Sequence, residues 1–197
     1  MPAVKALADE RQNLLAYLSR LGGVAPGPLA KELEAIPSKA IERITHPPPG
    51  EWPSYNGASD GNRHSALEQI DTKNVDRLQL QWSYTLPFPN LQTTPLMSDG
   101  VMYVTGPNRV CALDPRTGSE IWCFARPRSK GRNGANPNRG AAVLGDRIFF
   151  TTDDAHLLSL NRITGAVMWE VIMPEGQEGV GATSAPLVAG GLGPVTK

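Results

Sequence analysis

The 197-residue sequence has no apolar run that approaches the roughly 20 residues needed for a transmembrane helix. Its N-terminus also lacks the uninterrupted apolar core of a signal peptide, because Asp9, Glu10 and Arg11 fall inside that stretch. Lysine and arginine together number 19, as do aspartate and glutamate, so no basic excess favours a nucleic-acid surface. These absences predict a globular chain with no membrane span and no nucleic-acid partner.

Cysteine is equally scarce. The sequence has only Cys111 and Cys123, and it contains neither a zinc-binding pattern nor the C-x-x-C-H motif of covalent haem attachment. We therefore expect no covalently attached haem in this chain. The two cysteines flank a predicted hairpin and could face each other across it, but we expect two unpaired structural thiols.

Glycine and proline are abundant, with 20 and 18 residues, which favours many turns and short strands. The N-terminal part differs from the rest, since residues 8–21 show the leucine spacing of an amphipathic helix that ends at Gly22-Gly23. Residues 29–36 are a candidate second short helix, and the stiff run 47–50 follows. We therefore divide the chain into a helical segment (1–23), a Pro/Gly-rich linker (24–50) and a strand-rich region (51–197).

The strand-rich region contains an internal repeat. A shift of 47 residues aligns DGVMYVTGPNRVCALDPRTGSEIW at 99–122 with DRIFFTTDDAHLLSLNRITGAVMW at 146–169 without a gap. The identities include Thr117/Thr164, Gly118/Gly165 and Trp122/Trp169. Trp82, 40 residues before Trp122, is expected to close a preceding strand, and a third copy begins at Ala182.

Each copy is typical of a four-stranded antiparallel meander. In the first copy we expect strands at 96–97, 101–104 and 110–113 and a fourth that ends at Trp122, joined by turns at 98–100 and 114–118. Four short strands in every 40 to 50 residues is the pattern of a β-propeller blade. The prediction is an all-β fold: an incomplete β-propeller of about two and a half blades, preceded by one or two short α-helices. A β-sandwich is the alternative, but an ungapped repeat that ends in T-G-x-x-x-W is hard to obtain from a sandwich.

The repeat also predicts a binding site. The innermost strand of each blade starts near the propeller axis, so a ligand there is touched by the same position of successive blades. Gln92, Arg139 and Thr183 are such equivalents, each three residues before Pro95, Ala142 or Pro186. A guanidinium and two neutral hydrogen-bonding side chains suit an anionic, oxygen-rich ligand.

The C-terminal parts of the two repeat copies resemble the tryptophan-docking motif of the quinoprotein (PQQ-dependent) alcohol dehydrogenases. They read ALDPRTGSEIW in the first copy and SLNRITGAVMW in the second. GEWPSYNG at 50–57, NRHSALEQI at 62–70, NVDRL at 74–78 and NRG at 138–140 extend the resemblance. It implies an eight-bladed propeller with PQQ and calcium on its axis, located in the periplasm. The implied reaction oxidises an alcohol or polyol to the carbonyl compound and passes electrons to PQQ and then to a cytochrome c.

The resemblance places PQQ-contacting residues at Arg139 and Thr183, whereas Gln92 stands where the family commonly has Glu. The family's adjacent cysteine pair would fall at Asn133-Gly134 and is absent. Its calcium ligands and catalytic Asp occur in later blades, so we assign no metal ligand and no base, and we expect this chain alone to be an inactive fragment. We expect structural or solvent-facing roles for His64 and His156, and a turn at Asp153-Asp154.

Two alternatives stay open. Residues 1–23 resemble the end of a c-type cytochrome domain, in which a Met-Pro supplies the axial iron ligand; Met1 is either such a remnant or an initiator. The second alternative concerns function: a PQQ-like propeller without catalysis can serve as a protein-binding scaffold.

Overall fold

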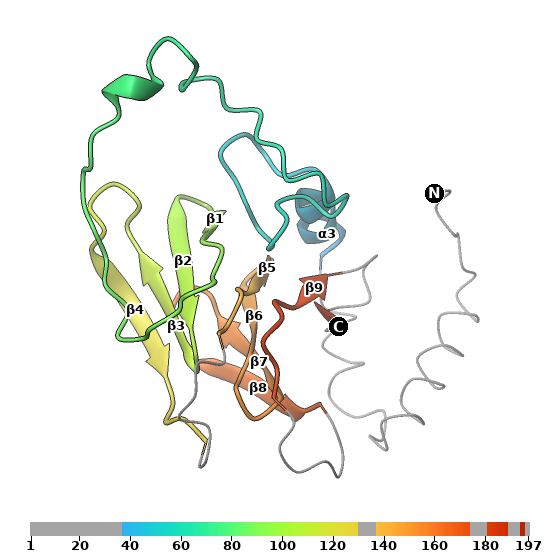
Figure 1. Cartoon of the computed structure of the whole chain (residues 1–197). Coiled ribbons are helices and arrows are strands. Elements are labelled where there is room, and N and C mark those ends of the chain that lie inside the picture. Colours follow the sequence, from blue (N-terminus) through green and yellow to red (C-terminus); the bar gives the residue numbers. More distant parts are fainter. Residues whose placement is uncertain (1–36, 130–136, 174–180, 189–193, 196–197) are drawn as a thin grey trace.

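The computed structural model describes residues 37–129, 137–173, 181–188 and 194–195, and its strands form two four-stranded antiparallel sheets (Figure 1). The first sheet consists of β1 (Leu96–Ser98), β2 (Val101–Gly106), β3 (Arg109–Leu113) and β4 (Glu120–Ala125). The second sheet consists of β5 (Ala142–Leu144), β6 (Arg147–Thr151), β7 (His156–Asn161) and β8 (Val167–Ile172). A further antiparallel pair follows, formed by β9 (Leu187–Val188) and β10 (Pro194–Val195).

This architecture confirms the predicted all-β partial propeller, with each repeat copy folded as one meander. The first turn shows why the sequence folds this way: Asp99 and Gly100 both have positive φ, at 49° and 74°, as a tight hairpin requires. The predicted helices at 8–21 and 29–36 lie outside the described residues. Within the described ranges, no helix is both long and apolar enough to cross a bilayer.

The main core lies between the two sheets. The side chains that form it are fully buried or nearly so, and two aromatic rings, Phe124 and Phe150, meet edge to face with centroids 6.5 Å apart. Each large apolar side chain removed from water contributes about 1.5–3 kcal/mol. The members are Leu96, Tyr103, Val110, Ala112, Ala141, Val143, Ile148, Phe150, Leu158 and Leu160.

The sheets are also joined by tryptophan docking. Trp122, in β4 of the first sheet, donates its indole N–H to the carbonyl of Arg162 in the β7–β8 turn, at 3.1 Å. The same turn contains Gly165, where an added Cβ would lie 2.5 Å from the Trp122 ring. The ring therefore lies flat against a glycine that has no room for a side chain.

Trp82 repeats this contact one step earlier. Its indole N–H donates to the carbonyl of Pro115 at 2.9 Å, and an added Cβ on Gly118 would lie 2.5 Å from its ring. The strand predicted to end at Trp82 is absent, since residues 78–82 have no strand structure. The next side chains along, Tyr84, Leu86 and Phe88, pack on the face of the first sheet that points away from the second.

Helix α3 (Ser38–Thr45) lies in the segment predicted to be a linker. It packs Ile44, together with Ala40 and Ile41, against Leu144 and Phe149 of the second sheet. Local sequence signals for this helix are weak, because its N-cap is Pro37, with no side-chain cap, and its first turn has no acidic residue. The remaining helical element is the short 3-10 turn η1 (Val75–Arg77).

The cysteine prediction is wrong: Cys111 and Cys123 form a disulfide. The register of β3 and β4 places them directly opposite each other, with their Cα atoms 4.1 Å apart. That separation brings the two thiols within bonding distance. Sequence spacing allowed this pairing, but only the register between the strands decides it.

Candidate functional site

The strands nearest the expected axis lie side by side. Strand β1 contacts β5, and β5 contacts β9. The segments that lead into them are joined by backbone hydrogen bonds, from the N–H of Thr94 to the carbonyl of Arg139 at 3.2 Å and from the N–H of Arg139 to the carbonyl of Thr183 at 3.0 Å. Successive blades therefore present equivalent residues to one region.

Arg139 and Thr183 are in direct contact. The Nη1 of Arg139 donates to the Oγ1 of Thr183 at 2.7 Å, and both side chains are half-buried. The backbone beside Arg139 is held by buried Asn138, whose Nδ2 donates to the carbonyl of Thr151 at 3.0 Å and whose Oδ1 accepts from the N–H of Gly140 at 2.9 Å. The guanidinium is thus positioned by a fixed backbone, which lowers the entropic cost of binding a ligand.

Gln92 behaves differently from its two equivalents. It is exposed, and it makes no hydrogen bond within the described part of the chain. Its neighbour Thr93 instead bonds Thr105 through their hydroxyls at 2.7 Å. The structure therefore brings together two of the three predicted residues, Arg139 and Thr183.

A cavity of about 230 Å³ adjoins this pair. We call it the axial cavity, because it lies beside the positions that the repeat predicts to be near the propeller axis. Arg139 supplies the charged group of its lining, and Gly140, with φ of +143°, lets the backbone pass close to Ala185. The residues that line the cavity are Tyr55, Asn56, Arg139, Ser184, Ala185 and Leu187. A pocket with one cation and several neutral hydrogen-bonding groups suits an anionic ligand.

Two residues that line the cavity, Tyr55 and Asn56, were not predicted as site residues from the sequence. They belong to a segment that does not repeat, so the repeat could not find them. The backbone of Trp52 pairs with Met97 of β1, through N–O contacts of 2.9 and 3.0 Å, and the carbonyl of Pro53 accepts from the N–H of Val143 at 2.8 Å. These bonds insert the segment between the innermost strands and carry its turn to the cavity. The signal in the sequence was the W-P-S-Y-N-G turn itself.

A second cavity, of about 250 Å³, lies between α3 and nearby turns of both sheets. The side chain of Arg43 pairs with Glu51 and with Asp99, and Asp99 also pairs with Arg162. These four charges are used in ion pairs. Lys39 also lines this cavity, but none of the three predicted contact residues does.

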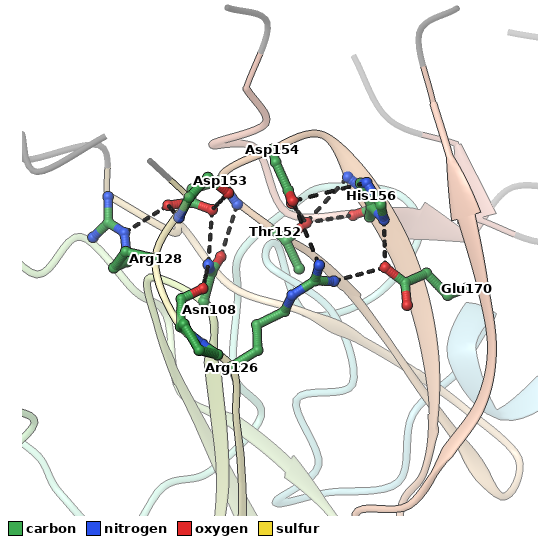
Figure 2. A network of polar contacts seen from close by, with 10 residues as sticks. Asn108, Arg126, Arg128, Thr152, Asp153, Asp154, His156 and Glu170 are labelled. Atoms are coloured by element: carbon green, nitrogen blue, oxygen red, sulfur yellow. Dashed lines mark hydrogen bonds and ion pairs between the residues drawn. The ribbon is translucent and has the colours of Figure 1, made fainter. Parts of the chain in front are cut away.

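Asp153 belongs to a polar network that joins the two sheets away from the axial cavity (Figure 2). Asn108, in the β2–β3 turn, donates to its carboxylate at 2.7 Å and accepts from its backbone N–H at 2.8 Å. Arg128 and Ser129 also donate to the carboxylate. Burial opposes ionisation of Asp153, but these hydrogen bonds outweigh it and hold its pKa below the usual value. A carboxylate held ionised in this way ties the sheets together and is a poor proton acceptor.

His156 takes part in the other half of the network in Figure 2. Its ring contacts Glu170 through Nδ1 and lies 3.8 Å from Asp154 through Nε2. Arg126 bridges the same two carboxylates, at 2.6 Å from Glu170 and 3.4 Å from Asp154. The ring lies among ion pairs and does not line the axial cavity, whose lining residues are all different.

The family model described as the β-propeller domain of PQQ glucose, ethanol and alcohol dehydrogenases matches residues 52–171, more than half of the sequence. The chain belongs to this family. The resemblance to the quinoprotein alcohol dehydrogenases is thereby confirmed.

Curated members of the family are similar to this chain in sequence. A quinoprotein alcohol dehydrogenase of Pseudomonas putida is 37% identical over 66% of this chain and 23% of its own length. A quinoprotein ethanol dehydrogenase of Pseudomonas aeruginosa is 31% identical over 95% of this chain and 30% of its own length. The chain thus spans less than a third of each of these relatives.

Solved structures show the same fold. The quinohemoprotein alcohol dehydrogenase ADHIIG of Pseudomonas putida superimposes with a TM-score of 0.70 at 35% identity, covering 75% of this chain and 23% of that one. A europium-containing methanol dehydrogenase superimposes with a TM-score of 0.65 at 29% identity, covering 78% and 28%.

Proposed function

We propose that this chain supplies one side of the PQQ site of a quinoprotein alcohol dehydrogenase. The contact between Thr183 and Arg139, the charged residue that lines the axial cavity, is the observation that carries the proposal. PQQ is an anionic quinone rich in oxygen atoms, and the donors of this cavity match that chemistry.

Each residue has a distinct task in this site. The Arg139 guanidinium has donors beyond the one used on Thr183, and these bind a carboxylate or a quinone oxygen of the cofactor. The hydroxyl of Thr183 accepts from Arg139 and keeps its own proton to donate to the same ligand. Bound PQQ supplies the electron acceptor for oxidation of an alcohol or polyol to its carbonyl compound.

The whole protein's activity is part of the same proposal. Relatives named 1-butanol dehydrogenase (cytochrome c) and quinohemoprotein alcohol dehydrogenase suggest a cytochrome c as the onward electron acceptor. Calcium beside PQQ and a periplasmic location belong to the proposal through the resemblance to the quinoprotein family. We assign no calcium ligand and no catalytic base to residues of this chain. Gln92 is a weaker candidate contact than Arg139 or Thr183, because it faces solvent.

Titration with PQQ in a calcium-containing buffer, followed by quenching of tryptophan fluorescence, tests the proposal. Arg139→Met removes a charge-assisted hydrogen bond of about 1.5–3 kcal/mol and should weaken binding about 10- to 150-fold. Thr183→Val removes a neutral bond of about 1 kcal/mol and should weaken it about fivefold. Arg116→Met is the matched control, because Arg116 is exposed and pairs with nearby Asp114.

Equal affinities for wild type and Arg139→Met would refute the assignment of this site. A folded wild-type chain that binds no PQQ would refute the proposal itself and favour a protein-binding propeller instead.

A further inference from the structure

The face of the first sheet that packs against Tyr84 carries a cluster of potential metal ligands. Cys111 and Cys123 lie opposite each other there, and Glu120 is close by. One ligand atom from each of these three residues lies within 4.8 Å of the other two. The cluster shares no residue with the axial cavity.

A local irregularity in the sheet brings Glu120 to this face. Ala112 pairs with Trp122, but the next residue, Leu113, pairs with Glu120, so Ile121 is an extra residue without a partner. Leu113 is on the same face as Cys111, since side chains alternate along a strand. Its partner Glu120 therefore shares that face with Cys123. Without the bulge, Ile121 would occupy the position that the carboxylate takes.

The second sheet provides an internal comparison. It has the same register shift, between Ser159 and Leu160, so the bulge is a general feature of these blades. The positions equivalent to Cys111, Glu120 and Cys123 are occupied there by Leu158, Val167 and Glu170. The blade therefore forms without any of the three potential ligands, so the four-stranded meander does not itself require them.

Tyr84 orients the carboxylate. Its hydroxyl donates to the Oε2 of Glu120 at 2.8 Å and lies 3.5 Å from the Sγ of Cys123. Carboxylates that bind metals are commonly held by such a second hydrogen bond.

We propose that the reduced cysteine pair, together with Glu120, binds a thiophilic divalent cation such as Zn²⁺. A phosphine or dithiol reductant delivers two electrons, and two protons from solvent complete the conversion of the S–S bond into two thiols. The cation then displaces both thiol protons to solvent and binds two thiolates and one carboxylate, and water takes the fourth tetrahedral position. Zinc–sulfur bonds of about 2.3 Å require the sulfurs to separate, which side-chain rotation allows without moving the strands. When dissolved oxygen takes two electrons from the two thiolates, and two protons from solvent convert it to hydrogen peroxide, the S–S bond forms again and the cation is released.

Cobalt(II) is the probe for this site, because thiolate ligands give it a charge-transfer absorption in the near ultraviolet. The full-length chain is reduced with a phosphine, freed of reductant without oxygen, and titrated with Co²⁺. We expect one cobalt per chain, displaced by Zn²⁺, and no absorption from the oxidised chain. Cys123→Ser should abolish the band.

Glu120→Gln is the decisive variant, because it retains both thiols and leaves the disulfide of the oxidised form intact. It should weaken cobalt binding at least about tenfold, the smallest effect usual for groups that merely support a ligand. Glu68→Gln, a change at an exposed carboxylate outside the cluster, should leave binding unchanged.

Any of three results of the cobalt titration would overturn the proposal: no charge-transfer band in the reduced wild type, a band that survives Cys123→Ser, or equal affinities for Glu120→Gln and wild type. Far-ultraviolet circular dichroism of the reduced chain is recorded in parallel. A chain that loses its β signal on reduction would also refute the site, because the sheet register no longer assembles the ligands.

Discussion

Replacement of Gly165 by alanine tests whether tryptophan docking stabilises this fold. The new Cβ would lie 2.5 Å from Cε3 and 2.9 Å from Cδ2 of Trp122, closer than carbon atoms approach in folded proteins. The substitution also places a side chain at φ of +73°. Two costs therefore add: about 1–2 kcal/mol for the left-handed backbone and about 1–3 kcal/mol for the overpacked ring.

Gly100→Ala separates these two costs. Gly100 has nearly the same φ, +74°, but an added Cβ there meets nothing within 4 Å. Both variants share the backbone strain and the loss of entropy in the unfolded chain. The difference between them, about 1–3 kcal/mol, is therefore the contact with the indole.

Urea unfolding followed by tryptophan fluorescence measures both variants under the same conditions. The free energy of unfolding typically falls by about 2 kcal/mol for each molar increase in urea. The urea midpoint of Gly165→Ala should therefore lie about 1 M below that of Gly100→Ala. Equal midpoints would refute the reasoning, since they would mean that the indole gains nothing from lying against this glycine.

Three further outcomes are expected. Reduction of the Cys111–Cys123 disulfide, which closes a loop with a sequence separation of 12, should lower the free energy of unfolding by about 2–3 kcal/mol, and an unchanged urea midpoint after phosphine treatment would contradict this. Arg128→Met leaves the carboxylate of Asp153, whose side chain is 2% exposed, with fewer donors and should cost about 2–4 kcal/mol in the same assay, whereas no loss would show that the pair is dispensable. Because the pKa of Asp153 is lowered on folding, its stabilising effect is present above the unfolded pKa of about 3.9 and is lost as the pH falls through the folded value. Asp153→Asn should therefore reduce the acid dependence of the melting temperature below about pH 4, and identical profiles would argue against this role.

The repeat predicted the parts of the fold that recur. Its identities fall on Gly118 and Gly165 and on Trp122, which are the residues of the docking contacts. Such contacts have the same steric demands in every blade, so the same residue types return at the same spacing. The strand positions followed because the turns between them obey the same local rules.

The repeat could not predict what is particular to one blade. The disulfide depends on which residues of β3 and β4 face each other. The bulge sets this register, and the alternation of side chains along a strand does not predict where a bulge occurs. Helix α3 is stabilised by the side chains of Ile44 and its neighbours against the second sheet, not by capping signals.

The candidate site was predictable only in part. Equivalence in the repeat placed the backbones of Arg139 and Thr183 side by side, and their side chains meet. The same equivalence does not fix where a side chain points, so Gln92 turns to solvent. Tyr55 and Asn56 reach the cavity from a segment that occurs once, and a repeat gives no information about such a segment.

The two docked indoles have a consequence for folding. Trp82 binds the first sheet and Trp122 joins the first sheet to the second, so each contact couples one unit only to its immediate neighbour. Stability in such an array is the sum of what each unit contributes and what each junction contributes, as in a one-dimensional chain of coupled spins. Folding can then nucleate in either sheet and spread to the other through the Trp122 contact. A substitution at one junction lowers the stability of the adjacent unit and has no direct effect on the units beyond it.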